Sequence, residues 1–297
     1  MKYCRHIPVL LISALMLPLS SLISNAQSAQ QVQALLSSQS PLIVTVKVIY
    51  KTSMIAGGNS TNREGKSDTT GVVITSDGLV MLSTTSYSTD SLASIFSGGD
   101  MPGFSMKTVP TDFKVTIGKE SKEYTAILAA TDSILGLTFI QISDLDGRKL
   151  ASLDMSKSQQ PSVGERVVAV NRLTKGFDYA PYFSSAQISG QIDLPRTAYM
   201  LDGSIGSLGL PVYNLQGDLL GILTTLKPTV SQDTDEGGFS SLIRLFSGGG
   251  GGIIQTFLVP TSTVQTVIAQ AEVRAKAELA KQALKPAVTQ KSGTAKK

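Results

Sequence analysis

Two serines that could act as nucleophiles, Ser204 and Ser207, lie in a glycine-containing turn over residues 202–209. A serine hydroxyl attacks a carbonyl group efficiently only when a neighbouring base takes its proton. Histidine, the usual base, occurs once, at His6, and the single cysteine is Cys4. A site at this turn would therefore need an unusual base, such as a lysine whose pKa is lowered by burial. The spacing of the sequence nominates no lysine for that role, so both serines are also interpretable as ordinary turn residues.

A cleavable signal peptide is predicted over residues 1–29. Two basic side chains precede an apolar run at residues 7–19, and small residues follow it. The run is short and contains a proline, which favours cleavage over a membrane anchor. We expect cleavage after Ala26 or Ala29 and export to the periplasm or the cell exterior. Cleavage would remove the only cysteine and the only histidine, so the mature protein would hold no disulfide, no Cys- or His-ligated metal and no Ser–His pair.

The formal net charge of +4 is unevenly distributed along the chain. Residues 27–271 carry 17 basic and 20 acidic side chains, whereas seven basic and two acidic side chains follow from Glu272 onward. Such a basic tail could contact an anionic surface, although a solvated tail without a partner is the commoner outcome. No feature indicates a specific nucleic-acid site. The tail residues that would make the contact are Arg274, Lys276, Lys281, Lys285, Lys291, Lys296 and Lys297.

Short apolar and β-branched runs predict strands in two groups, separated by a surface connection near residue 160. Ser76-Asp77-Gly78 lies between two apolar runs, which predicts a hairpin. The predicted strands are residues 42–50, 71–82, 113–117, 124–130 and 137–142 in the first group, and residues 166–170, 183–188, 197–201, 211–215, 219–223 and 253–259 in the second.

The segments between these runs are predicted to be loops. Residues 57–70 are polar, residues 86–110 are rich in serine, glycine and methionine, and residues 227–252 end in five glycines. From Thr261 the apolar residues recur with helical period, and past Pro286 we expect disorder. The sequence therefore predicts an all-β double β-barrel over residues 30–271, with barrels at about 42–150 and 160–260, a C-terminal helix and a basic, Ala/Lys-rich helical to disordered tail over residues 272–297.

Three segments, in chain order, resemble motifs of trypsin-like serine proteases of the HtrA (DegP-like) type. Gly71–Leu82 is similar to G-x-V-I-x-x-D-G-x-I-L-T, and Asp132–Ile142 is similar to D-x-x-x-D-L-A-V-L-K-I. Gly206–Ile222 is similar to G-N-S-G-G-P-L-V-N-x-x-G-x-x-x-G-I, and weaker similarity extends over residues 163–170 and 257–264. The resemblance implies two six-stranded barrels with a cleft between them, covers residues 42–271 and ends before any PDZ domain.

Carrying over the catalytic positions of that family indicates a degenerate site. The resemblance places Thr85 at the base, Gly136 at the orienting aspartate and Leu208 at the nucleophile. It also places the backbone of Gly206 and Leu208 in the oxyanion loop, but the run over residues 202–206 is about two residues shorter than in the family. All three catalytic side chains are therefore predicted to be absent.

No cofactor or metal site is predicted elsewhere. Asp233, Asp235 and Glu236 could bind a hard cation, but a short acidic run in a loop is usually only solvated. The first hypothesis is a secreted pseudoprotease that binds or scaffolds a peptide or protein by strand addition, in the inter-barrel cleft or on the inserted loops. The alternatives are an active serine-type endopeptidase with an unconventional Ser–Lys or Asp-based site, and an envelope-associated structural protein held by its tail.

Overall fold

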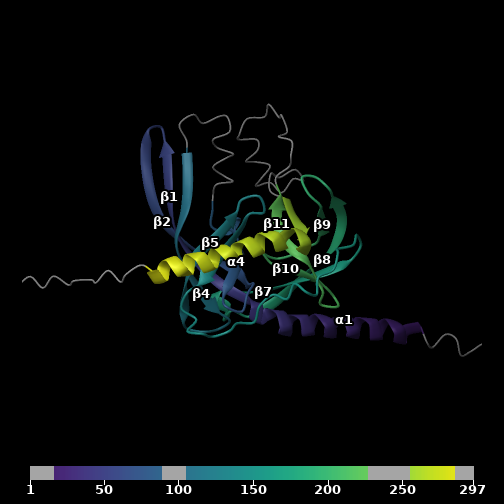
Figure 1. The fold of residues 1–297 in the computed structure, drawn as a ribbon. Coiled ribbons are helices and arrows are strands. Elements are labelled where there is room, and N and C mark those ends of the chain that lie inside the picture. The colour runs from purple at the N-terminus through teal and green to yellow at the C-terminus, as the bar shows by residue number, and fades with distance from the viewer. Residues whose placement is uncertain (1–16, 89–104, 227–254, 285–297) are drawn as a thin grey trace, which may run out of the picture.

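The computed structural model describes residues 17–88, 105–226 and 255–284. The strands in these ranges form two closed antiparallel barrels of six strands each, and a long helix follows them (Figure 1). The predicted all-β double barrel with a C-terminal helix is thus confirmed.

The first barrel has the strand order β1-β2-β3-β6-β5-β4 and the second has the order β10-β11-β12-β9-β8-β7. The strands of the first are β1 (Ile43–Ala56), β2 (Asn59–Val73), β3 (Leu79–Ser83), β4 (Ser105–Ile117), β5 (Glu123–Asp132) and β6 (Leu137–Ile142). Those of the second are β7 (Arg166–Arg172), β8 (Pro181–Ile192), β9 (Ala198–Asp202), β10 (Pro211–Asn214), β11 (Leu219–Leu226) and β12 (Gln255–Pro260). The helices are α1 (Leu17–Gln39), α4 (Thr261–Leu284) and the short 3-10 helices η1 (Ser40–Leu42), η2 (Thr84–Ser86) and η3 (Lys175–Phe177).

Strand β3 shows why some segments are apolar at every position. Val80 and Leu82 pack inside the first barrel, whereas Leu79 and Met81 face the larger core that the second barrel shares with the helices. Alternate residues of a strand point to opposite faces, so a strand between two cores must be apolar on both. This continuous run is also what allowed the strand to be predicted.

The hairpin between β2 and β3 forms at the predicted Ser-Asp-Gly turn. Gly78 has a φ of +92°, and its N–H donates to the carbonyl oxygen of Thr75 at 3.0 Å. A Cβ at this glycine would lie 2.6 Å from Cδ1 of Leu145. The left-handed backbone conformation therefore favours glycine at this turn, and a larger residue would also have to displace the Leu145 side chain.

The prediction of a loop over residues 57–70 is wrong. Residues 59–70 belong to β2, which pairs with β1 from Asn59 to Val72 around a Gly57-Gly58 turn, and both glycines have positive φ. The predicted loop over residues 86–110 is also wrong at its end, because β4 begins at Ser105; residues 89–104 lie outside the described residues. The ends of these strands are mostly exposed, so they lack the alternation of apolar residues that would have indicated them.

Helix α4 begins at Thr261, directly after β12, as the helical period predicted. One face of the helix buries Val264, Ile268, Ala271 and Ala275, and it packs on β5 of the first barrel and β11 of the second. The helix thus holds both barrels together (Figure 1). Helix α1 extends through the predicted cleavage region. None of the helices in the described ranges has an apolar stretch long enough to cross a membrane.

Candidate functional site

Three turns that carry the predicted catalytic positions meet at the junction of the two barrels. Thr85 lies in η2, Gly136 lies in the turn before β6, and Leu208 lies in the turn before β10. The N–H of Thr84 donates to the carbonyl oxygen of Gly136 at 2.8 Å. Gly209 is packed so closely that a Cβ there would lie 2.9 Å from the backbone nitrogen of Ser83. The structure therefore brings the three turns together.

The side chains at these positions cannot perform acyl transfer by the usual route. The Thr85 hydroxyl is 2.7 Å from the Ser83 hydroxyl, and a hydroxyl is a poor base at neutral pH. Gly136 has no side chain and adopts a φ of +61°, where most side chains are strained. Leu208 has no atom that can attack a carbonyl group. Within the described ranges, these three positions therefore supply no base, no orienting carboxylate and no nucleophile.

Ser207 lies next to this point, but its hydroxyl faces a donor instead of a base. The Nδ2 amide of Asn171 donates to Ser207 Oγ at 3.1 Å. An amide group does not accept a proton, so this contact gives the hydroxyl no added nucleophilicity. Ser204 is exposed on the same turn. The N–H of Gly206, one of the expected oxyanion-loop donors, donates instead to Ser184 Oγ at 3.2 Å.

The family of the chain is shown by a match to a family model described as the trypsin-like peptidase domain. The match covers residues 69–222, which is more than half of the 297 residues. The chain belongs to the trypsin-like peptidase domain family. Among solved structures, this trypsin-like domain is similar to the apo MamO protease domain from Magnetospirillum magneticum, at 16% identity and a TM-score of 0.44, over 78% of this chain and 96% of that chain. No curated protein matches it.

The buried side chain of Asn171 links the two barrels of the trypsin-like domain. Its Oδ1 accepts hydrogen bonds from Oγ1 of Thr70, on β2, at 2.9 Å and from the N–H of Arg172 at 2.7 Å. Its Nδ2 donates to Ser207 and to the hydroxyl of Tyr182 at 3.0 Å. Sequence analysis missed this residue; the available signal was a polar side chain that directly follows four apolar residues of β7.

The lysines of the trypsin-like domain give no support to a Ser–Lys site. Within the described ranges, no hydrogen bond joins a lysine amine to Ser204 or Ser207. A lysine base needs a lowered pKa. Lys47 shows the opposite, because its hydrogen bond to Glu123 raises its pKa. In the described part of the chain, six lysines lie within 4.0 Å of carboxylates, namely Lys47, Lys51, Lys114, Lys119, Lys122 and Lys281.

Some of the remaining candidate residues lie in segments that the structure does not describe. The acidic residues Asp233, Asp235 and Glu236 lie in residues 227–254, which are not described. Among the residues that are described, no group of three His, Cys, Asp or Glu side chains could hold a metal ion. Of the basic tail, Arg274, Lys276 and Lys281 lie on α4, and Lys285, Lys291, Lys296 and Lys297 follow the last described residue.

Proposed function

We propose that this trypsin-like domain is an exported, catalytically inactive pseudoprotease of the HtrA type that works as a peptide- or protein-binding module. The observation that supports the proposal is the junction of the barrels, where Thr85, Gly136 and Leu208 occupy the expected catalytic positions. The neighbouring Ser207 is hydrogen-bonded to an amide donor. The fold is kept, and no group among the described residues is in place to activate Ser204 or Ser207.

Labelling with a fluorophosphonate probe tests whether any serine is activated. We expect the wild-type protein and the Ser207→Ala and Ser204→Ala variants to label equally and only at the level of heat-denatured protein, because no described side chain acts as a base toward either hydroxyl. Trypsin in the same reaction is the positive control. Stoichiometric labelling of the native protein that is lost in one alanine variant would support the Ser–Lys alternative and contradict the proposal.

The strand edges that a peptide could join are concentrated on one arm of the first barrel. β3 pairs with β2 only at residues 71–73, and β5 pairs with β4 only from Phe113 onward. Among the described strands, residues 59–70 of β2 and 105–112 of β4 therefore pair only with β1, and the three strands extend away from the barrel (Figure 1). Unpaired edges accept an added strand through main-chain hydrogen bonds, whereas closed barrels hide theirs.

Apolar side chains on this arm give a binding peptide more than backbone contacts. Ile55 on β1 and Val109 on β4 are each 45% exposed, in a region where most neighbouring side chains are polar. Exposed apolar residues beside a free edge can hold the alternate side chains of an added strand. We therefore place the peptide site on the arm of β1, β2 and β4, in preference to the inter-barrel cleft.

Replacing the apolar residues of the arm tests this placement. Random heptapeptides displayed on phage and selected on the wild-type protein are expected to bind the Ile55→Lys/Val109→Lys variant at least about tenfold more weakly, a change of about 1.4 kcal/mol. The matched control is Ile134→Lys, which changes a 65% exposed residue in the turn before Gly136. Binding would be measured by fluorescence polarisation of the synthesised peptides. Weakening by the Ile134 variant and not by the arm variant would place the site in the cleft instead.

A further inference from the structure

A cavity of about 510 Å³ is lined by none of the predicted catalytic positions. It is formed by five separate segments: Pro41 of η1, Val73 at the end of β2, the end of β4 with the turn after it, residues 148–151 after β6, and Arg172 at the end of β7. Its volume is within the range of small-molecule sites and is too small for a folded partner. Part of its lining is apolar, contributed by Pro41, Val73, Ile117, Leu150 and Ala151.

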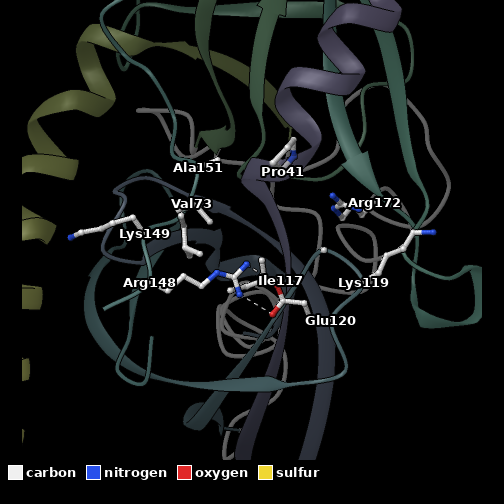
Figure 2. Close-up of a pocket in the computed structure, with 11 residues that line it drawn as sticks. Pro41, Val73, Ile117, Lys119, Glu120, Arg148, Lys149, Ala151 and Arg172 are labelled. Atoms are coloured by element: carbon white, nitrogen blue, oxygen red, sulfur yellow. Dashed lines mark hydrogen bonds and ion pairs between the residues drawn. The ribbon is translucent and has the colours of Figure 1, made fainter. Parts of the chain in front are cut away.

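The charged residues that line this cavity are mostly cationic. Lys119, Arg148, Lys149 and Arg172 line it together with one carboxylate, Glu120. Figure 2 shows the guanidinium groups of Arg148 and Arg172 lying toward the centre, while the ammonium groups of the two lysines point outward on opposite sides. An excess of positive charge around a partly apolar hollow produces a field that attracts anions.

Arg172 is a half-buried cation without a carboxylate partner among the described residues. Its Nε donates to the carbonyl oxygens of Ser40 and Ile43, its Nη2 to Ser40 and its Nη1 to Tyr179, at 2.8–3.2 Å. These bonds use three of its five N–H groups and leave one on each Nη. Burial lowers its pKa, which reflects the desolvation of a positive charge that no anion balances. An anion entering the cavity would supply that balance.

The carboxylate of Glu120 forms an ion pair with Arg148, the other arginine of the cavity. Arg148 donates from Nη2 to Glu120 Oε1 at 2.7 Å and from Nη1 to Oε2 at 3.0 Å (Figure 2). The Tyr124 hydroxyl donates to the same carboxylate at 2.9 Å. This carboxylate neutralises Arg148 and repels a second anion, so it sets how strongly the cavity attracts one.

We propose that this cavity binds a small organic anion, with a carboxylate or phosphate group directed to the Arg148 and Arg172 guanidinium groups and a short hydrocarbon body on the apolar wall. Guanidinium forks bind both anionic groups through paired hydrogen bonds. The apolar residues Ile117, Leu150 and Pro41 give the hydrocarbon part its contact. This site is separate from the peptide-binding arm and does not depend on it.

Four aromatic or inorganic probes test the proposal on the full chain by titration calorimetry. Phenyl phosphate and benzoate carry the two candidate anionic groups, phenol lacks charge, and inorganic phosphate lacks a hydrocarbon body. We expect phenyl phosphate or benzoate to bind, and the one that binds more tightly identifies the preferred anionic group. Phenol and inorganic phosphate are expected to bind at least tenfold more weakly. Equal binding of phenol, equal binding of inorganic phosphate, or no binding of either organic anion would overturn the proposal.

Two charge variants locate the binding. Glu120→Gln is expected to raise the affinity for the bound anion about tenfold, because it removes the competing carboxylate. Arg148→Gln is expected to lower it about tenfold. The Glu120 side chain is 34% exposed, so its replacement by the isosteric amide should leave the fold intact. Glu64→Gln is the matched control, since it removes the same charge from the Lys51–Glu64 ion pair on the arm. Equal effects of the two glutamate variants would contradict a local site.

Discussion

Replacement of Gly221 by alanine is expected to destabilise the trypsin-like domain by about 4 kcal/mol or more, and replacement by valine to prevent folding. Gly221 lies in β11, where it pairs with Val212 of β10 and with Pro260 of β12. A Cβ at this position would lie 2.1 Å from the carbonyl oxygen of Val259 and 2.9 Å from its carbonyl carbon. These are backbone atoms of a paired strand, so the clash is relieved only by separating β11 from β12.

Gly176→Ala is the control for this prediction. A Cβ at Gly176 meets no atom within 4 Å, and its φ is not in the left-handed region. We expect its free energy of unfolding to change by less than about 0.5 kcal/mol. Urea unfolding followed by far-UV circular dichroism would measure both variants. A Gly221 variant as stable as the Gly176 variant would show that the two strands do not approach as closely as the structure describes.

Replacement of Asn171 by leucine is expected to destabilise the domain by about 3 kcal/mol. The change removes two donated and two accepted hydrogen bonds, and it leaves the hydroxyls of Thr70, Tyr182 and Ser207 without this partner. A net hydrogen bond contributes about 1 kcal/mol, and an unsatisfied buried group adds a desolvation penalty. Because Asn171 is only 2% exposed, water cannot replace the lost contacts at that side chain.

The matched control for Asn171 is Asn62→Leu on the exposed part of β2. Asn62 accepts one hydrogen bond, from the Ser53 hydroxyl at 2.7 Å, and lies in solvent. We expect this variant to lose less than about 1 kcal/mol of stability in the same unfolding experiment. A similar loss in both variants would mean that the link between the barrels contributes no more than a surface contact.

The double barrel was predictable because its central strands are buried on both faces. Segments such as Leu79–Leu82 and Val167–Val170 are apolar throughout, and turns such as Ser76-Asp77-Gly78 separate them. Buried strands and turn residues are the features that a sequence shows most directly. The helix from Thr261 was visible for the same reason, since Val264, Ile268 and Ala271 recur on the buried face.

The arm was not predictable from hydrophobic pattern. Residues 59–70 pair with β1 by main-chain hydrogen bonds, while their side chains are mostly polar and many are exposed. Such a strand carries no period-2 signal, and only the Gly57-Gly58 turn indicated a hairpin. A loop was predicted there because the segment is polar and contains glycine.

The anion cavity and the Asn171 hydrogen bonds were missed for a different reason. Pro41, Glu120, Arg148 and Arg172 are far apart in the sequence and meet only because the barrels and η1 pack together. Nothing in the spacing of single residues encodes such a meeting. The predicted catalytic positions, unlike the cavity residues, could each be located by their place within a local sequence motif. The structure shows that the turns that carry them converge.

The central claim is that this chain keeps the trypsin-like fold without serine-based catalysis, and turnover of an unfolded protein tests it most directly. Reduced, fluorescently labelled casein would be incubated with the wild-type protein and with a Ser204→Ala/Ser207→Ala variant, and new peptide termini would be identified by mass spectrometry. We expect the two proteins to give no more cleavage than buffer, because within the described ranges the Ser207 hydroxyl contacts an amide donor and no base contacts Ser204. Cleavage by the wild-type protein that disappears in the double variant would contradict the claim.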